Sequence, residues 1–281
     1  MEMRVKFTET APFVGVEYQY DVEKILYKGK SRFQEIMVFE NPNFGRMLIL
    51  DNVVQITDRD EFFYHEMLSH VLLHAHPNPR KVVVIGGGDG GTVREVCKHP
   101  GVEQVYFIEI DPEVIRVSEE FFPKVASANK DPRVEIKCMD GAEFIKSCKG
   151  DIDVVLVDST DPIGFARTLY TDNFFKTIHE AMREDGMFGI QSESLLLHAD
   201  IIAEVQQSIR KVFPISDLIT FQTATYPGNW WTISVGSKKH DPRKVARPVE
   251  VGTRYYSDEM HAHSFLPRGF YERVLTGKLG W

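Results

Sequence analysis

A glycine-rich loop with a carboxylate inside it is the first feature of this sequence that could do chemistry. Residues Gly86–Gly91 read GGGDGG, and Gly86, Gly88 and Gly91 match the G-x-G-x-x-G pattern after an apolar run. Glycines in this position let the backbone approach a ligand at the open end of a sheet. Asp89 would repel a pyrophosphate, so the loop favours a cationic nucleoside such as S-adenosylmethionine or its decarboxylated form. A tight turn without a ligand is the alternative.

Two more carboxylates stand where apolar runs of the chain end. Glu109 lies near the end of the run 105–110, where an acidic side chain can accept hydrogen bonds from both ribose hydroxyls. Asp111 is better placed to cap the helix that follows. Asp140 and Gly141 follow the next run. Asp140 could accept a hydrogen bond from an adenine amino group, cap the next helix, or do both.

Asp158 and Asp161 follow the apolar run 152–157, on the lip of a central strand where ligands bind in open α/β sheets. The segment also reads as an ordinary turn, because Asp and Pro are turn formers. Together with Asp89, however, three carboxylates would converge on one crevice, which costs free energy unless a cation or a proton neutralises them. The sequence offers no matching set of metal ligands, so we expect no metal and favour an amine substrate.

The histidines between residues 65 and 76 raise the metal hypothesis separately. His70 and His74 are spaced i, i+4, but no HExxH pattern joins them, so packing is the favoured interpretation. His65 is the exception, because it follows Tyr64 and lies close to the expected domain junction.

The elements that must position these residues change in character near residue 76. Residues 14–57 alternate short β-prone segments with turns, which predicts a small antiparallel β domain. A helix is expected over about 61–74, and Pro77 and Pro79 after it indicate where it ends. We therefore predict an N-terminal β-strand domain with a linking helix over residues 1–75 and a Rossmann-like catalytic domain over residues 76–281.

Apolar strands and helical patterns alternate in the second domain, which is typical of a parallel sheet covered on both faces. We expect a doubly wound α/β sheet of the class I methyltransferase type. The expected strands are Val82–Ile85, Val105–Ile110, Val134–Met139, Ile152–Val157, Met187–Gln191, Leu218–Ala224 and Trp231–Ser237. The expected helices are Thr92–His99, Pro112–Phe122, Gly141–Cys148, Thr171–Met182 and Asp200–Val212.

Composition and charge limit the classes of protein that this chain can be. The 281 residues are 43% hydrophobic and 26% charged, as in soluble globular proteins. The sequence contains no run of about 18 or more apolar residues, so we expect no membrane span. The first residues lack the apolar stretch of a signal peptide. The net charge of −8 disfavours nucleic acid as a partner. Three scattered cysteines fit neither a disulfide framework nor a zinc motif, so we expect a cytoplasmic protein.

Six segments together resemble the spermidine synthases, the family of polyamine aminopropyltransferases. They are SRFQEI at 31–36, LDNVVQ at 50–55, DEFFYHEM at 60–67, GGGDGG at 86–91, DSTDPIG at 158–164 and YPG at 226–228. Glycine loops are common, but this loop between YHEM and DSTDP is highly specific, and the resemblance covers nearly the whole chain. It implies transfer of an aminopropyl group from decarboxylated S-adenosylmethionine to an amine, by default putrescine. 5′-Methylthioadenosine is released, and no further cofactor is implied.

The resemblance also implies roles for single residues. For the donor, it implies binding by Gln34, Gly86, Gly88, Asp89, Glu109, Asp140 and Gly141. For the amine, it implies contacts from Tyr64, His65, Asp89, Asp158, Asp161 and Tyr226. Asp158 is the implied proton acceptor. Family members form dimers or tetramers with contacts from the N-terminal β domain, so we expect a homodimer or a homotetramer.

Elementary chemistry agrees with these implied roles. Decarboxylation leaves the donor with an ammonium and no carboxylate, which suits Asp89. An attacking primary amine with a pKa of about 10.4 arrives protonated, so Asp158 must accept its proton or favour the neutral form. The sulfonium is already a good leaving group, so alignment and deprotonation are the main requirements.

The loop after DPIG departs from the family pattern. Phe165, Ala166 and Arg167 stand where the family usually has Pro-Ala-Glu. Phe165 replaces a proline that contacts the nucleoside. Arg167 replaces an acid with a cation that either points to solvent or changes which amine is accepted. Agmatine, cadaverine and longer polyamines therefore stay open beside putrescine.

Three other functions stay open at this point. A methyltransferase would have to recognise the carboxylate of intact S-adenosylmethionine, for which Asp89 has the wrong sign. A non-catalytic nucleoside or polyamine sensor would not need the full set of carboxylates that this chain has. A nicotinamide-dependent dehydrogenase would place its pyrophosphate against Asp89.

Overall fold

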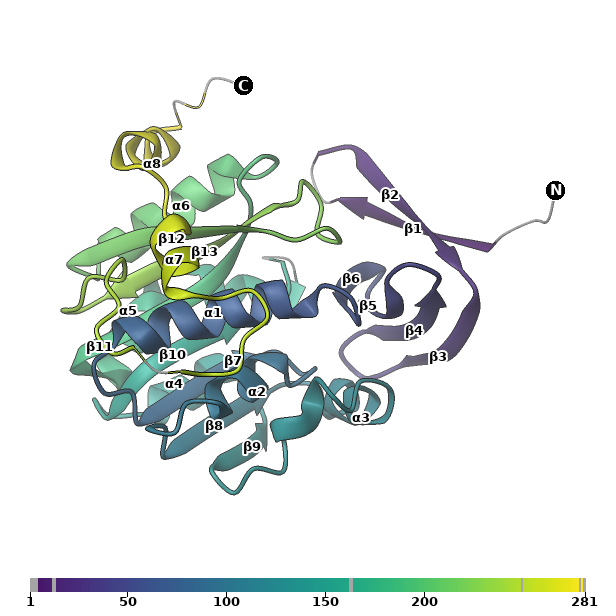
Figure 1. The fold of residues 1–281 in the computed structure, drawn as a ribbon, viewed down its shortest axis with the longest axis horizontal. Helices are drawn as coiled ribbons and strands as arrows, with labels where there is room; N and C mark the ends of the chain where they lie inside the picture. The colour runs from purple at the N-terminus through teal and green to yellow at the C-terminus, as the bar shows by residue number, and fades with distance from the viewer. Residues whose placement is uncertain (1–4, 12–13, 162–163, 249, 278, 280–281) are drawn as a thin grey trace.

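The computed structural model describes residues 5–11, 14–161, 164–248, 250–277 and 279 of the chain. These residues form two parts that stand side by side (Figure 1), with two small antiparallel sheets at one end and a seven-stranded sheet at the other.

The N-terminal part contains a two-stranded sheet, β1–β2, and a four-stranded antiparallel sheet in the order β3-β4-β5-β6. Its strands are β1 (Val5–Ala11), β2 (Val16–Val22), β3 (Lys24–Lys30), β4 (Glu35–Asn41), β5 (Gly45–Leu50) and β6 (Val53–Thr57). Asp51 and Asn52 join β5 to β6 at positive φ angles of 46° and 66°. Asp and Asn tolerate this conformation, and it matches the twist of a tight hairpin.

The large sheet has the strand order β12-β13-β11-β10-β7-β8-β9, and β13 runs antiparallel to its neighbours. Its strands are β7 (Lys81–Gly86), β8 (Gln104–Glu109), β9 (Val134–Cys138), β10 (Ile152–Asp158), β11 (Met182–Ser194), β12 (Ile215–Gln222) and β13 (Trp230–Ser237). Chain order reverses between β7 and β10, which pair in parallel. Ligands of such sheets bind at the carboxyl ends of the strands at this reversal.

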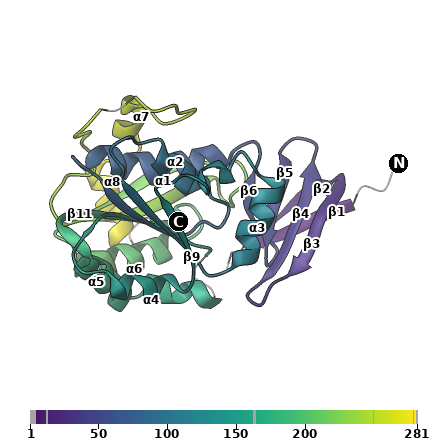
Figure 2. The same cartoon turned by 90° about the horizontal axis from the view of Figure 1, so that it is seen from below.

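Helices cover both faces of the large sheet (Figure 2), which explains why its strands read as continuous apolar runs. The helices are α1 (Glu61–Ala75), α2 (Gly91–Cys97), α3 (Pro112–Phe121), α4 (Gly141–Ser147), α5 (Asp172–Ala181), α6 (Ala199–Arg210), α7 (Asp258–His263) and α8 (Arg268–Leu275). Helices α1 and α2 pack on one face, and α4, α5 and α6 pack on the other. Short 3₁₀ helices span Ala126–Ala128 and Gly164–Tyr170.

Helix α3 packs against both parts of the molecule, because its Ile115 joins the buried cluster of the large sheet while other residues contact the N-terminal part. Val114 of α3 and Phe122 just after it share a buried cluster with Ile36 and Val38 of β4. Because α3 follows β8 directly, this cluster couples the strand that ends in Glu109 to the N-terminal sheet.

The predicted fold class, a doubly wound sheet with a small N-terminal antiparallel β domain, is confirmed by this architecture. Strand β1 was not predicted, because it precedes the segment with a clear β pattern, and neither were α7 and α8. Helix α1, predicted as a link, packs on the large sheet. The division of the chain into residues 1–75 and 76–281 stays a prediction.

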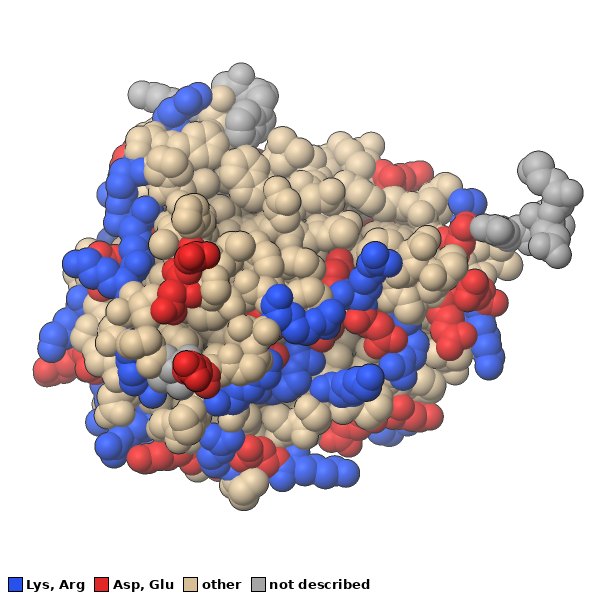
Figure 3. All heavy atoms as spheres, viewed as in Figure 1, with Lys and Arg blue, Asp and Glu red and all other residues tan. Residues whose placement is uncertain are grey.

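Charge is mixed on the surface drawn in Figure 3, where basic and acidic side chains lie interspersed. The absence of a nucleic-acid partner stays a prediction. Among the described residues, no helix combines the length and the apolarity that crossing a membrane requires.

Candidate active site

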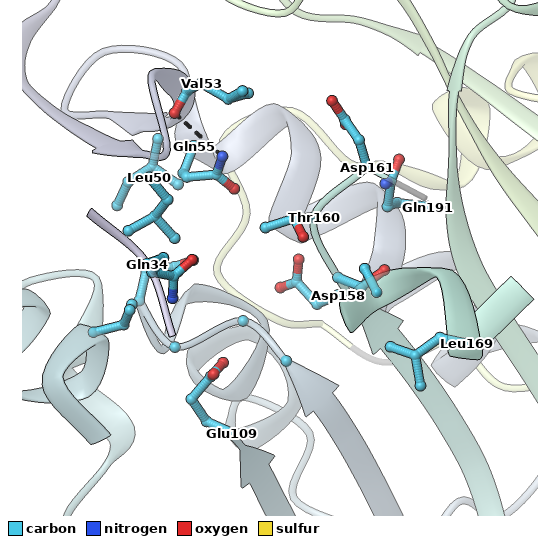
Figure 4. A pocket seen from close by; sticks show the side chains of 18 of the residues that line it. Gln34, Leu50, Val53, Gln55, Glu109, Asp158, Thr160, Asp161, Leu169 and Gln191 are labelled. Carbon is cyan, nitrogen blue, oxygen red and sulfur yellow. Dashed lines mark hydrogen bonds between the residues drawn. The ribbon is translucent and has the colours of Figure 1, made fainter. Parts of the chain in front are cut away.

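A cavity of about 490 Å³ lies between the carboxyl ends of β7 and β10 and the N-terminal sheets. In Figure 4, Gln34 and Glu109 lie toward one end, Asp161 and Gln191 lie at the other, and Asp158 points into the space between them. The structure brings together every residue predicted for the site. The cavity is lined by Gln34, Tyr64, His65, Gly86, Gly88, Asp89, Glu109, Asp140, Gly141, Asp158, Asp161 and Tyr226, among others.

The glycine loop lies so close to Asp158 that side chains would not fit. Gly86 and Gly87 adopt φ angles of 78° and 68°. A Cβ on Gly86 would collide with the Asp158 carbonyl oxygen, and one on Gly87 would lie 2.5 Å from the Asp158 carboxylate. Glycine at these positions therefore lets the loop hold a ligand next to that carboxylate.

Asp158 is held at both carboxylate oxygens. Tyr64 of α1 donates a hydrogen bond to Oδ1 at 2.7 Å, and Thr92 of α2 donates to Oδ2 at 2.5 Å. Burial, and then the charge of Asp89, raise the pKa of Asp158 to about 6. A carboxylate with this pKa accepts a proton more readily than an exposed one, which suits a general base.

His65 lies between two carboxylates behind the glycine loop. Its Nδ1 is 2.6 Å from Glu61 Oε2, one helical turn earlier, and its Nε2 is 3.2 Å from Asp89 Oδ1. Burial alone would lower the pKa of His65, but the Asp89 and Glu61 carboxylates outweigh burial and raise that pKa to about 10. Burial alone would raise the pKa of Asp89, but the charge and the hydrogen bond of the His65 imidazolium outweigh burial and lower that pKa below its usual range. Asp89 is therefore an ionised group that can pair with a cation.

His65, Asp89 and Asp158 also bring possible metal-ligand atoms within 4.8 Å of one another. The family resemblance implied all three as amine contacts, but the sequence did not indicate them as a possible metal-ligand set, because they come from α1, the glycine loop and β10. A protonated His65 has no lone pair to give to a metal, since both ring nitrogens carry hydrogen. The arrangement therefore suits an ammonium group better than a metal ion.

The end of the cavity predicted for the nucleoside contains Glu109 and Gln34. Glu109 is buried, its Oε1 accepts the Asp111 N–H at 2.9 Å, and burial raises its pKa to about 7. Asp111 accepts the Glu113 N–H at 3.1 Å and the Gln34 Nε2 donor at 2.9 Å. The prediction that Asp111 caps the following helix is confirmed, and the same carboxylate fixes Gln34 beside β8.

Asp140 and Gly141 complete this end of the cavity. Asp140 accepts the Ala142 N–H at 2.7 Å, which confirms that it caps α4. A Cβ on Gly141 would collide with the Ile85 side chain. Both residues line the cavity, and the adenine contact of Asp140 stays a prediction.

Tyr226 reaches the cavity on the connection between β12 and β13, which extends toward the N-terminal hairpin in Figure 1. Its ring packs edge-on against Tyr64 with centroids 5.7 Å apart, and its hydroxyl donates to the Gln55 carbonyl at 2.7 Å. Asp60, at the start of α1, accepts the Thr225 N–H at 3.1 Å instead of capping its own helix. These bonds fix an aromatic wall beside Asp158 that can contact a cationic chain.

Three carboxyl groups line the other end of the cavity: Asp161, Glu193 of β11 and Glu9 of β1. Burial raises the pKa of Glu9 to about 8, and burial together with the charge of Asp161 raises that of Glu193 well above its usual range. Val54 N–H donates to Glu9 Oε1 at 2.9 Å, whereas Oε2 has no hydrogen-bond partner among the described residues.

Glu9 and Glu193 were missed in the sequence. Glu193 lies near the carboxyl end of an apolar strand, as Asp158 does, and this position is a signal that could have identified it. No such signal marks Glu9, because the segment around it was not read as a strand.

The loop that departs from the family pattern is described in part. Pro162 and Ile163 lie outside the described residues, and so does the side chain of Phe165. Ala166 lines the cavity, and Arg167 is exposed, which matches the solvent-facing interpretation of that cation.

Two family models match the chain. Residues 61–245 match the spermine/spermidine synthase domain, and residues 5–58 match the spermidine synthase tetramerisation domain. The polyamine aminopropyltransferase of Hydrogenobaculum sp. is 50% identical over 97% of this chain and 98% of its own. Polyamine aminopropyltransferase 1 of Aquifex aeolicus is 48% identical over 98% of each chain.

Solved structures agree with these matches. The spermidine synthase from Thermotoga maritima has a TM-score of 0.90 at 35% identity, covering 98% of this chain and 95% of that one. A spermidine synthase in complex with the transition-state analogue AdoDATO has the same TM-score and identity, covering 98% of this chain and 96% of that one. With these matches spanning both parts of the fold, the chain belongs to the spermidine synthase family of polyamine aminopropyltransferases.

Proposed function

We propose that this protein transfers the aminopropyl group of decarboxylated S-adenosylmethionine to putrescine, which gives spermidine and 5′-methylthioadenosine. The order of carboxylates along one cavity is the observation that supports this most. Glu109 lies at one end, Asp158 lies at the middle and Asp161 lies at the other end (Figure 4), and the charge of Asp89, which also lines the cavity, acts on Asp158. In that order, Glu109 matches the nucleoside, Asp89 and Asp158 match the reacting centre with its cationic groups, and Asp161 matches the free ammonium of a diamine.

For the donor, we propose that Glu109 accepts hydrogen bonds from the ribose hydroxyls and that Gln34 contacts the nucleoside from the N-terminal part. In this proposal Asp140 and Gly141 contact the adenine, and the sulfonium binds beside the glycine loop. Asp89 pairs with the aminopropyl ammonium. The carboxylate of intact S-adenosylmethionine would meet this same anion, which supports aminopropyl transfer over methyl transfer.

For the reaction, we propose that Asp158 accepts the proton of the attacking amine. The amine nitrogen then bonds to the carbon next to sulfur, the carbon–sulfur bond breaks, and 5′-methylthioadenosine leaves with the electron pair. The bonds from Tyr64 and Thr92 support this role, because they fix the carboxylate beside the glycine loop. The proposed reaction needs no metal and no cofactor other than the donor.

For the acceptor, we propose that Tyr64, His65 and Tyr226 contact the amine chain and that Asp161 binds its distal ammonium. Glu9 and Glu193 line the same end of the cavity, where burial raises the pKa of both carboxyl groups and His198 Nδ1 lies 3.4 Å from Glu193 Oε2. A diamine supplies one cation there, which favours putrescine. The alternatives are agmatine, which carries a guanidinium as its distal group, and cadaverine and longer polyamines, which carry an ammonium on a longer chain.

We also propose that the protein is a homodimer or a homotetramer. The support is the match of residues 5–58 to a model described as a tetramerisation domain. The cytoplasmic location stays a prediction.

A product assay tests the function. Protein is incubated with decarboxylated S-adenosylmethionine and, separately, putrescine, agmatine, cadaverine or spermidine, and methylthioadenosine and each adduct are quantified by mass spectrometry. We expect methylthioadenosine with spermidine as the dominant adduct. Another dominant adduct would overturn putrescine as the acceptor. Tight donor binding without methylthioadenosine from any amine would favour the sensor instead.

A further inference from the structure

Two groups of histidines lie outside the catalytic cavity. His70 and His74 of α1 approach His99, which follows α2, with possible ligand atoms within 4.8 Å. His70 already uses both ring nitrogens, with His99 Nε2 at 2.8 Å and Glu95 Oε2 at 2.9 Å. The positive charge of Arg247 also faces His74 and His99. This group is closed to solvent and poorly suited to another cation, which fits the packing interpretation.

The second group consists of His76, Asp185 and His240, and it differs in two respects. The Nε2 atoms of both histidines have no hydrogen-bond partner among the described residues, and the Asp185 and His240 side chains are partly exposed. Arg247 acts on this group too, through His76. His76 follows α1, Asp185 lies near the start of β11, and His240 follows β13, so three separate segments meet there. Their possible ligand atoms also lie within 4.8 Å of one another. Asp185 is near the amino end of its strand, at the edge of the sheet opposite the catalytic cavity.

The distances in this second group are those of ligands around an ion rather than those of hydrogen bonds. His76 Nε2 is 3.9 Å from Asp185 Oδ1, and His240 Nε2 is 3.5 Å from Asp185 Oδ2. Both nitrogens are buried and have no hydrogen-bond partner among the described residues. Two ligands bound to one zinc at about 2.0–2.2 Å in tetrahedral geometry stand roughly 3.3–3.5 Å apart. Small side-chain movements would therefore complete a site.

We propose that His76, Asp185 and His240 bind one divalent transition-metal ion, Zn²⁺ above all, with water completing its coordination. Two imidazoles and one carboxylate form a ligand set that zinc uses in proteins. The Asp185 side chain is 38% exposed, so an ion and its water can enter from solvent.

The charges around the site permit a cation. The carboxylates of Asp185 and Asp153 raise the pKa of His76. His240 and Arg247 lower it. Arg183 pairs with Asp153 at 3.1 Å. Burial lowers the pKa of His76, which favours the neutral imidazole, the form that ligates metals.

Binding requires one rearrangement. The Asn78 N–H now donates to His76 Nδ1 at 3.1 Å, so the ring proton is on Nε2. For Nε2 to bind the ion, that proton must move to Nδ1 and the Asn78 N–H must turn to water. Asn78 is exposed, so water can replace the lost hydrogen bond at small cost. The bound ion would then join the end of α1, the start of β11 and the segment after β13.

Metal binding to the untagged protein, dialysed against chelator, tests this site. Zinc binding is measured by calorimetry, and Co²⁺ is added as a probe whose visible absorption reports the ligand geometry. His240→Gln removes one ligand. Asp158→Asn removes the group in the catalytic cavity that could ligate a metal, and His263→Gln changes an exposed histidine.

We expect one equivalent of zinc in the wild type and in both controls, and affinity at least about tenfold weaker in His240→Gln. Zinc at 100-fold above its Kd should raise the Tm of the wild type by about 5 °C, and that of His240→Gln much less. Absence of zinc binding to the wild type would overturn the proposal, and so would equal binding by His240→Gln. An equivalent lost in Asp158→Asn instead would place the ion in the catalytic cavity. None of these readouts depends on aminopropyl transfer.

Discussion

At the scale of single residues, the site uses buried carboxyl groups whose surroundings differ. Asp158 accepts two side-chain hydroxyl hydrogen bonds and faces the charge of Asp89. Glu109 accepts hydrogen bonds from the backbone N–H groups of Asp111 and Ile110 and lines the cavity. Burial is the main cause of the raised pKa in both groups. We expect Asp158 to affect turnover and Glu109 to affect nucleoside binding, so different measurements test them.

Replacing Asp158 should affect turnover more than binding. Asp158→Asn keeps the size of the side chain but removes the proton acceptor, so kcat should fall by roughly 10²–10⁴, as is typical for lost acid–base catalysis. Steady-state kinetics with saturating donor measure this effect. Asp161→Asn is the matched control and should raise KM for the amine more than it lowers kcat. Near-normal turnover in Asp158→Asn would remove it from the role of base.

Glu109 should make nucleoside binding dependent on pH. In the proposed function, the Glu109 carboxylate accepts hydrogen bonds from both ribose hydroxyls. Its raised pKa of about 7 means that this carboxylate forms as pH rises through that value. The affinity for methylthioadenosine should therefore increase from below pH 7 to above it, as calorimetry on both sides of that pH would show. Glu109→Gln should bind more weakly and lose this dependence. A dependence that persists in Glu109→Gln would point to another group.

At the scale of elements, helix α1 serves two purposes with consecutive residues. Tyr64 and His65 face the cavity, while the Glu66 carboxylate accepts the backbone N–H groups of Arg254, Tyr255 and Tyr256, each at 2.8 Å. The C-terminal segment is thereby attached to the helix that positions the candidate catalytic residues.

Removing the Glu66 carboxylate should detach this segment. Glu66→Ala leaves three N–H groups without their charged acceptor, so the free energy of unfolding should fall by about 3 kcal/mol. Urea denaturation measures the loss, and hydrogen exchange at residues 254–256 locates it. Glu204→Ala, at an exposed position of α6, should change stability by no more than about 0.5 kcal/mol. Unchanged exchange at 254–256 in Glu66→Ala would contradict this account.

At the scale of the whole molecule, the cavity exists because two parts of the chain close on each other. Glu9 and Gln34 come from the N-terminal part, and Asp111 and Thr225 bond directly to that part. The same part also exposes two apolar side chains on its strands, Val5 at 63% and Ile25 at 51%. Exposed apolar residues on strands fit a surface that packs against another copy of the chain.

Assembly should therefore depend on the N-terminal surface. The wild type should have a mass two or four times that of the 32.2 kDa chain by analytical ultracentrifugation. Ile25→Lys should lower that mass or weaken the association, because it would bury a charge between copies. Leu196→Lys, at a side chain 50% exposed in the other part, is the matched control. An equal mass for the wild type and Ile25→Lys would exclude Ile25 from the contact.

The sequence by itself determined the sheet and the main chemistry of the site. Continuous apolar runs such as 152–157 predicted buried parallel strands, and the carboxyl ends of such strands must meet at one edge. Asp89, Glu109 and Asp158 could therefore be placed together without a structure. The positions of these carboxylates at the ends of strands, and the turn of the glycine loop, follow from the backbone preferences of neighbouring residues.

Only the tertiary structure decided which distant residues complete the cavity and how its charges balance. Glu9 comes from a strand with no clear pattern, and its burial depends on β6, whose Val54 N–H it accepts. His65 is cationic because Glu61 and Asp89 flank it, although Asp89 lies on another element. His76, Asp185 and His240 are far apart in the chain, and nothing local links them. Such juxtapositions follow from packing between elements, so no sequence spacing could have shown them.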